Sequence, residues 1–126
     1  MDKLNLIIAG GRDFTDELIM STTIKAIINA KGLTNTPITV VCGMARGADM
    51  TGYKLAKKWG MPVAEYPADW KTHGKSAGPI RNKQMADNAD ALIAYWDGKS
   101  RGTANTIQTM KAADKPVIVI PYGEQS

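Results

Sequence analysis

Short apolar runs alternate with longer segments of helical spacing along the chain. The apolar runs are Leu4–Ala9, Ile38–Cys42, Met61–Tyr66, Ala91–Trp96 and Pro116–Pro121. Glycine, proline or aspartate stands at or directly after the end of each run. We therefore expect five β-strands. Their successive residues are mostly apolar, which is typical of strands buried on both faces of a parallel sheet.

The segments between these runs predict helices, because their apolar residues recur three or four positions apart. In the first, Thr15 can supply the N-cap and Gly32 the stop. Gly60 ends the second helix, and Pro79 suits the first position of the third. The fourth runs to Lys115. The pattern is therefore βαβαβαβαβ.

This alternation predicts an α/β fold, a Rossmann-like doubly wound parallel five-stranded sheet with helices on both faces. We assume the strand order 3-2-1-4-5 and expect residues 1–126 to form a single domain. Right-handed crossovers then place the loops that follow the strands at one edge of the sheet. The longest irregular connection, Pro67–Ala77, is a candidate mobile flap over that edge.

Four glycine-containing turns each carry an arginine, and the fold brings them to this common edge. The arginines are Arg12, Arg46, Arg81 and Arg101. Arginine in loops, together with helix N-termini, favours phosphate or carboxylate groups. The candidate ligand-binding residues are Gly10, Gly11, Arg12, Asp13, Gly43, Met44, Ala45, Arg46, Gly47, Arg81, Asn82, Asp97, Gly98, Ser100, Arg101, Gly102 and Thr103. Several of the glycines would let the backbone approach a ligand closely.

Each of these residues also has a purely structural interpretation. Any one glycine turn can simply connect a strand to a helix. Asp13 and Asp97 either form turns or act on a ligand, and Asp49 either complements the dipole of its helix or is catalytic. Arg81 can form a surface ion pair and Asn82 a helix cap. No catalytic residue is assigned, and the three aspartates are the candidates.

Other chemistries find less support in the sequence. It contains no Gly-x-x-x-x-Gly-Lys-Ser/Thr loop and no Gly-x-Gly-x-x-Gly after the first strand. Cys42 lies inside an apolar strand far along the chain from His73, the only histidine, so we expect neither a catalytic thiol nor a zinc site. We expect no cofactor or metal. Trp70 and Trp96 are expected to pack rather than to stack on bases.

The net charge of +4 in 126 residues suits an anionic partner without identifying it. No apolar run reaches the roughly 20 residues of a membrane-spanning helix. The N-terminal residues Met1–Asn5 lack the layout of a signal peptide. We therefore expect a cytoplasmic protein without a membrane partner.

Four motifs together resemble the YspA/YpsA-related branch of the SLOG superfamily, which occurs in bacteria and phages. They lie at Gly10–Phe14, Cys42–Asp49, Ala77–Met85 and Asp97–Thr103. The superfamily also contains DprA (Smf) proteins and LOG nucleotide phosphoribohydrolases. The resemblance implies a Rossmann-like sheet that binds a nucleotide or nucleotide-derived ligand, and it implies homo-oligomers. The chain departs from the LOG enzymes after Gly102-Thr103, where it has no glutamate at the expected place of their catalytic acid.

Three functions follow as hypotheses. The first is binding of a nucleotide-derived small molecule, for sensing or sequestration. The second is a hydrolase that cleaves an N-glycosidic or phosphoester bond of such a ligand with Asp13, Asp49 or Asp97. The third is a DprA-like single-stranded nucleic-acid binder, which is less favoured because few aromatic residues are available for stacking.

Overall fold

A computed structural model describes residues 2–123 of the chain, so Met1 and residues 124–126 of the expected single domain lie outside the described residues. The elements in chain order are β1 (Leu4–Gly10), α1 (Glu17–Ala30), β2 (Ile38–Cys42), α2 (Ala48–Lys58), β3 (Val63–Glu65), α3 (Trp70–His73), the 3₁₀ turn η1 (Gly74–Ser76), α4 (Ala77–Asp87), β4 (Ala91–Trp96), α5 (Arg101–Ala112) and β5 (Val117–Pro121).

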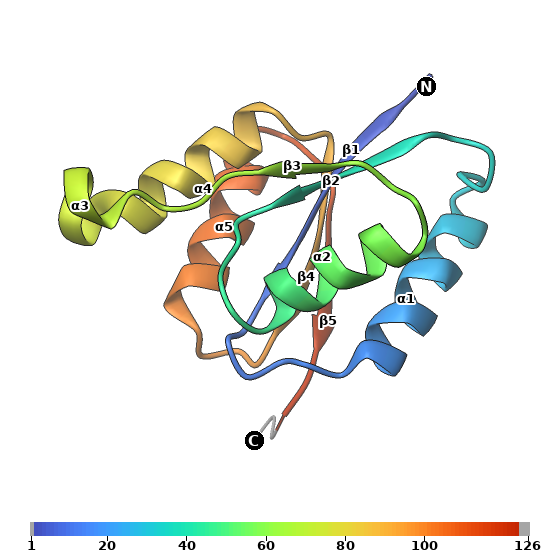
Figure 1. Cartoon of the computed structure of the whole chain (residues 1–126), viewed down its shortest axis with the longest axis horizontal. Coiled ribbons are helices and arrows are strands. Elements are labelled where there is room, and N and C mark those ends of the chain that lie inside the picture. The colour runs from blue at the N-terminus through green and yellow to red at the C-terminus, as the bar shows by residue number, and fades with distance from the viewer. Residues whose placement is uncertain (1, 124–126) are drawn as a thin grey trace.

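The five strands form one parallel sheet in the order β3-β2-β1-β4-β5, which confirms the predicted topology. β1 lies in the middle, and its Leu6 pairs with Val40 of β2 on one side and with Ala91 of β4 on the other. β3 and β5 form the two edges (Figure 1). The C-terminal ends of β1 and β4 are therefore neighbours at the point where the chain reverses its direction across the sheet.

Helices cover both faces of the sheet, as the sequence predicts. On one face, Met20 and Ile24 of α1 and Leu55 of α2 pack against strand residues such as Ile8. The other face packs against α4 and α5, as Figure 1 shows. Ile7 is fully buried there. Alternate residues of β1 therefore contribute to two separate hydrophobic cores. Within residues 2–123, no helix has both the length and the apolar character that crossing a membrane requires.

Two helix starts differ from the prediction. Asp16, rather than Thr15, is the N-cap of α1, and its Oδ1 accepts the Ile19 N–H at 2.9 Å. α4 begins at Ala77, so Pro79 is its third residue and not its first. The shift is tolerated because N–H groups in the first helical turn have no intrahelical acceptor, so proline removes none of the helix's own hydrogen bonds.

The connection predicted to be irregular between Pro67 and Ala77 is largely helical. Asp69 is the N-cap of α3, with its carboxylate accepting the Thr72 N–H at 3.1 Å, and η1 follows directly after α3. The prediction of an irregular backbone was therefore wrong, whereas the segment does lie beside the cavities described below through Pro67, Ala68 and Trp70. The missed signal is the aspartate N-cap, which stabilises a helical turn too short to show apolar periodicity.

Several boundaries also move inward. The strand predicted at Met61–Tyr66 is only β3, Val63–Glu65, at the edge of the sheet. α5 ends at Ala112 rather than at Lys115, and Ala113 is its C-cap. Such shifts of a few residues are ordinary at element ends, where hydrogen bonds are incomplete.

Candidate functional site

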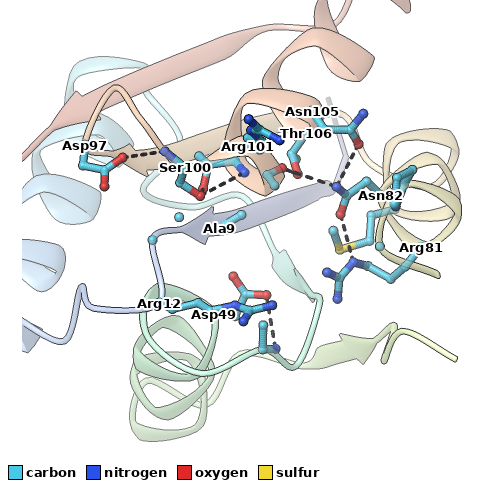
Figure 2. A pocket seen from close by; sticks show the side chains of 18 of the residues that line it. Ala9, Arg12, Asp49, Arg81, Asn82, Asp97, Ser100, Arg101, Asn105 and Thr106 are labelled. Atoms are coloured by element: carbon cyan, nitrogen blue, oxygen red, sulfur yellow. Dashed lines mark hydrogen bonds between the residues drawn. The ribbon is translucent and has the colours of Figure 1, made fainter. Parts of the chain in front are cut away.

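A cavity of about 620 Å³ lies over the C-terminal ends of β1 and β4. We call it the first cavity (Figure 2). Among the predicted site residues, those that line it are Gly10, Gly11, Arg12, Asp13, Ala45, Asp49, Arg81, Asn82, Asp97, Ser100, Arg101, Gly102 and Thr103. The volume lies within the roughly 300–1,000 Å³ of small-molecule sites. Residues of all four predicted turns therefore line the first cavity.

A second cavity of about 370 Å³ adjoins the first. It is bordered by the predicted residues Gly43, Met44 and Arg46. The two cavities share Arg12, Ala45, Trp70 and Arg81 as lining residues. Of the predicted site residues, only Gly47 and Gly98 line neither cavity in the described part of the chain.

The loops after β1, β2 and β4 pack directly on one another beneath the first cavity. Gly11 donates its N–H to the Tyr95 carbonyl at 3.0 Å and accepts the Ala48 N–H at 3.1 Å. A side chain on Gly47, which has a φ of +86°, would place its Cβ 2.4 Å from the Gly11 oxygen. At Gly10 a Cβ would lie 2.3 Å from the Tyr95 oxygen. The close contact between the loops is by itself sufficient to require glycine at these two positions.

Gly102 differs from the glycines beneath the cavity. A Cβ on this residue would meet nothing within 4 Å, although Gly102 lines the first cavity at the start of α5. Its backbone is therefore open to a ligand. Helix N-termini carry N–H groups without intrahelical acceptors and attract anions.

Hydrogen bonds in the preceding turn position this helix start. Asp97 Oδ1 accepts the N–H groups of Lys99 and Ser100, both at 2.8 Å. These contacts, chiefly the one from Ser100, lower the pKa of the Asp97 carboxyl. Ser100 is the N-cap of α5, and its hydroxyl lies 3.1 Å from that of Thr103. Asp97 therefore forms a turn, which is one of the two interpretations that the sequence allowed.

Asp49 is a buried carboxylate beneath the β2–α2 loop. Only 6% of the residue is exposed, and its Oδ2 accepts the Ala45 N–H at 3.3 Å. Burial raises the pKa of Asp49 to about 6, while Arg81 and the backbone N–H groups of Ala45 and Gly10 act in the opposite direction. The N-cap of α2 is Gly47, so Asp49 does not cap its helix. It lies in the first turn of α2, as the dipole interpretation requires, and its carboxylate accepts hydrogen bonds from the β2–α2 loop and from the end of β1.

Arg81 and Asn82 connect α4 to the neighbouring elements. Arg81 donates from Nη1 to the Gly43 carbonyl and from Nε to Asn82 Oδ1, the latter at 2.9 Å. Asn82 donates in turn to Asn105 Oδ1 at 2.9 Å and to the Gly102 carbonyl at 3.4 Å (Figure 2). The pair forms the α4 wall of the first cavity. Neither the surface ion pair nor the helix cap considered for these residues is present among the described contacts.

Asp13 is held from the far end of the chain. The Tyr122 hydroxyl donates to Asp13 Oδ1 at 2.5 Å. Burial and this carboxylate raise the pKa of the Tyr122 hydroxyl. The segment after β5 is thereby connected to the β1–α1 loop. Each of the three candidate catalytic aspartates is therefore engaged in a contact that supports the loops.

Neither Cys42 nor His73 is among the residues that line the two cavities. The Cys42 thiol is buried, and burial raises its pKa to about 11, which disfavours the reactive thiolate. His73 is an exposed residue at the end of α3. Among residues 2–123, no group of three or more His, Cys, Asp or Glu side chains is placed to hold a metal ion.

Some lining residues were not predicted from the sequence. Asn105 and Thr106 lie three and four positions after Gly102, so they share its helix face, and this spacing could have identified them. Trp70, expected to pack in the interior, is 54% exposed and lines both cavities. That placement depends on the short helix α3, which gave no periodic signal. Trp96 does pack, against the core on the α4 and α5 face.

Comparisons with known proteins agree with this architecture. The structure of DNA processing protein A (DprA) from Streptococcus pneumoniae matches 96% of this chain with a TM-score of 0.71 and 17% identity, and the chain spans 51% of the DprA chain. At this identity the likeness shows the fold alone. The Gene 61 protein of Mycobacterium phage D29 is 38% identical over 89 residues, which are 64% of this chain and 70% of the phage protein.

A sequence profile supplies the family. The profile of the YspA, cpYpsA-related SLOG family matches residues 4–73. This span begins with β1 and ends with α3, so it contains both the β1–α1 and the β2–α2 loops of the site. The chain therefore belongs to the YspA, cpYpsA-related SLOG family.

Proposed function

We propose that this protein binds a nucleotide or nucleotide-derived ligand in the first cavity, with a phosphate at the N-terminus of α5. One observation carries the proposal: the cavity lies where β1 and β4 adjoin in a 3-2-1-4-5 sheet and is bordered by the open backbone of Gly102. Ligands of doubly wound sheets bind in the crevice at this switch point.

The charges around the cavity support an anionic ligand. Arg12 and Arg101 are exposed residues that line it from the β1–α1 loop and from the first turn of α5. Guanidinium groups bind phosphate through paired hydrogen bonds. Ser100 and Thr103 add hydroxyl groups at the same helix start. These residues form the proposed phosphate subsite.

Binding is favoured over hydrolysis by the state of the carboxylates. An N-glycosidic hydrolase needs a carboxylate near the developing positive charge on the sugar. Asp49 is buried beneath a loop, while Asp13 and Asp97 accept hydrogen bonds that hold the loops. These structural contacts support sensing or sequestration rather than turnover.

A thermal-shift and calorimetry panel tests the proposal. The compounds are ADP-ribose, NAD⁺, cyclic dinucleotides and nucleoside phosphates. We expect at least one to raise the melting temperature, because a ligand that binds only the folded state stabilises it. No stabilisation by any of them would contradict the proposal.

A pair of variants on one helix locates the subsite. Arg101→Gln removes a charge at the start of α5, and Lys111→Gln removes an equal charge near its end, outside both cavities. A hydrogen bond to a charged group contributes about 1.5–3 kcal/mol. We therefore expect Arg101→Gln to weaken ligand binding by roughly ten-fold or more and Lys111→Gln to leave it unchanged. Equal affinities of the two variants would place the ligand elsewhere.

Binding of single-stranded nucleic acid is the second candidate function. The exposed Trp70 and the exposed cations Lys71 and Lys75 beside it favour this alternative, as does the likeness of the fold to DprA. Strand binding combines a basic groove with aromatic stacking. A gel shift with single-stranded DNA at rising salt discriminates it, because binding that vanishes with modest salt reflects only general electrostatic attraction. A homo-oligomer, implied by the family resemblance, stays a prediction for size-exclusion chromatography.

A further inference from the structure

The two cavities form one divided groove at the C-terminal edge of the sheet. They have volumes of about 620 and 370 Å³ and share Arg12, Ala45, Trp70 and Arg81. A ligand that consists of one phosphate and one nucleoside would occupy only one of the two cavities. The second cavity is therefore unexplained by the phosphate subsite at α5.

Trp70 stands at the boundary between the two cavities. It is 54% exposed and belongs to neither hydrophobic core among the described residues. The turn that carries it is fixed, since Asp69 accepts the Thr72 N–H and the Trp70 carbonyl accepts the Gly74 N–H. A Cβ on Gly78 would lie 3.6 Å from the edge of the indole at Cη2, so the ring rests close to the start of α4. An indole held this way offers a flat apolar surface for stacking.

Positively charged side chains line both of the cavities that Trp70 borders. Arg101 lines only the first cavity, Arg46 lines only the second, and Arg12 lines both. The guanidinium of Arg81 is held by the carbonyl groups of Gly43 and Tyr66. The groove thus offers separate positive charges in the two cavities that share one aromatic platform.

We propose that this groove takes a dinucleotide, meaning two nucleosides joined through phosphate, with one nucleoside in each cavity and one of the bases stacked on Trp70. Arg12, common to both cavities, neutralises the linking phosphate. This inference rests on the proposed function and adds the class of ligand. Within the described chain, Trp70 is the only aromatic residue that lines either cavity. A longer strand would need several such platforms for its successive bases.

Calorimetric titrations with four probes test the inference. The probes are AMP, NAD⁺, the phosphodiester-linked dinucleotide pApA, and an oligodeoxyadenylate of about 12 nucleotides, within the site sizes of single-strand binders. We expect NAD⁺ or pApA to bind at least ten-fold more tightly than AMP. Equal affinity for AMP and both dinucleotides would overturn the inference and leave the proposed function intact. Tighter binding of the oligonucleotide would overturn it in favour of a strand. Binding of none of the four probes would also overturn the inference, whereas the proposed function is decided by the wider panel described above.

Variants at the boundary assign the effect to Trp70. Stacking on an aromatic side chain contributes about 1–3 kcal/mol per base, so Trp70→Ala should weaken dinucleotide binding roughly five-fold or more. AMP binding at the α5 subsite should stay within about two-fold. Trp70→Phe retains an aromatic face and should restore most of the affinity. Leu18→Ala, at an exposed apolar residue of α1 outside both cavities, is the matched control.

Two outcomes for these variants are decisive. A selective loss of dinucleotide binding in Trp70→Ala, with an unchanged melting temperature, supports the stacking role. Wild-type affinity for dinucleotides in Trp70→Ala, or an equal loss for AMP and for dinucleotides, overturns it. Arg46→Gln supplies a second measurement on the second cavity and should also weaken dinucleotides more than AMP.

Discussion

Glycine has different roles at the two ends of the parallel strands. We call the side where the strands begin the N-terminal edge and the side where they end the C-terminal edge. At the N-terminal edge, Gly32 and Gly60 follow α1 and α2 with φ values of +68° and +72°, and a Cβ on either would meet nothing within 4 Å. At the C-terminal edge, a Cβ on Gly10, Gly11 or Gly47 would fall 2.3, 1.7 or 2.4 Å from another protein atom. The first pair ends helices, whereas the second group allows loops to interlock.

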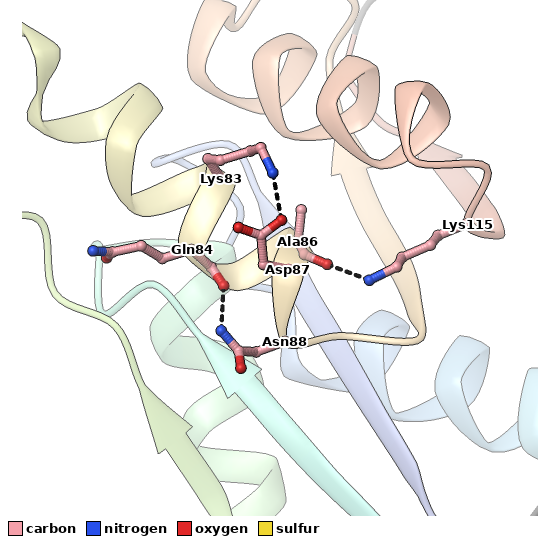
Figure 3. A network of polar contacts seen from close by, with 6 residues as sticks. All are labelled: Lys83, Gln84, Ala86, Asp87, Asn88 and Lys115. Carbon is pink, nitrogen blue, oxygen red and sulfur yellow. Dashed lines mark hydrogen bonds and ion pairs between the residues drawn. The ribbon is translucent and has the colours of Figure 1, made fainter.

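The polar contacts of the side chains also differ between the N-terminal edge and the C-terminal edge. Near the N-terminal edge, Asn88 donates to the Gln84 carbonyl at 2.8 Å, Lys115 donates to the Ala86 carbonyl at 2.6 Å, and Lys83 pairs with Asp87 (Figure 3). Most of these contacts lie within the end of one helix. At the C-terminal edge, the buried Asp49 and Asn82 connect separate loops and helices.

Both edges have long-range contacts, since at the N-terminal edge Asn5 donates from its backbone to Asp90 and from its side chain to the Asn88 carbonyl. The difference is that the contacts of the C-terminal edge join loops and helices through buried polar side chains. At the N-terminal edge each helix end is completed largely by its own neighbours in sequence. At the C-terminal edge the three loops beneath the first cavity depend on one another. Such mutual support is what a preorganised binding site requires. Substitutions that separate the two kinds of contact test this comparison.

The largest effect is expected from Gly47→Ala. The new Cβ would meet the Gly11 oxygen at 2.4 Å, and the residue has a φ of +86° and a ψ of −129°, a conformation that alanine disfavours. Backbone strain and overpacking each cost about 1–3 kcal/mol, so we expect a loss of about 3 kcal/mol or more in the free energy of unfolding. Gly60→Ala, with positive φ but open space, should lose only about 1–2 kcal/mol. Urea unfolding measures both, and equal losses would contradict the distinction.

The next effect is the pH dependence that Asp49 confers. Burial raises its pKa from 3.8 to about 6, so the folded protein holds this proton more tightly than the unfolded chain does. The stabilisation is therefore complete below about pH 4 and is lost as the pH rises through about 6. Relative to Asp49→Asn, the wild type should lose about 2 kcal/mol between pH 4 and 7, since one pKa unit corresponds to about 1.4 kcal/mol.

Glu17 serves as a control, because its pKa is shifted in the opposite direction to that of Asp49. The pKa of Glu17 is lowered by its hydrogen bond to Lys58, so its contribution to stability is lost as the pH falls. Relative to Glu17→Gln, the wild type should therefore become less stable toward acid. A constant difference between wild type and Asp49→Asn from pH 4 to 7 would show that Asp49 is not a buried, unfavourably ionised group.

Asn82→Ala should have an intermediate effect. It removes the acceptor of Arg81 Nε and the donor to Asn105 and Gly102 at a residue that is 4% exposed. Leaving such partners unsatisfied costs about 1–3 kcal/mol, and the wall of the first cavity should loosen. Asn88→Ala, at the exposed C-cap of α4, is the matched control. Chemical denaturation of both proteins checks this, and a greater loss for Asn88→Ala would reverse the comparison.

Lys83→Ala should have the smallest effect. Its ion pair with Asp87 joins two exposed side chains four residues apart on α4. Such pairs contribute about 0.3–0.5 kcal/mol and are screened by salt. The melting temperature should therefore change little, and ligand binding should be unaffected. A large destabilisation would mean that the N-terminal edge is more interdependent than its contacts indicate.

The sequence predicts the frame of this molecule well. Runs such as Ile38–Cys42 and Ala91–Trp96 match β2 and β4 residue for residue, because uninterrupted apolar runs between turn residues leave few alternatives. The strand order follows the general rules for doubly wound sheets and is confirmed. Thr15 and Pro79 were misplaced because neighbouring residues compete for the same cap and the same helical start.

The sequence predicts most of the residues that line the candidate site, but not the structural roles of those residues. Sequence cannot distinguish a glycine such as Gly47, which makes room for another loop, from Gly102, which leaves space open, because the difference lies in contacts far apart in the chain. The sequence indicates that Asp49 is an acidic residue at the start of a helix. Its burial beside Ala45 depends on how three loops pack together, which the sequence does not show. Trp70 could be placed only once α3 was known.

An amide NMR titration with ADP tests the central claim most directly, because it reports on both edges of the sheet at once. Binding at the C-terminal edge should shift the amide signals of residues 10–13 and 100–103, which line the first cavity, while those of residues 31–37 and 113–116 stay unchanged. This result would identify the interlocked loops as the nucleotide site. Shifts confined to residues 31–37 and 113–116, or none at saturating ADP, would contradict the account.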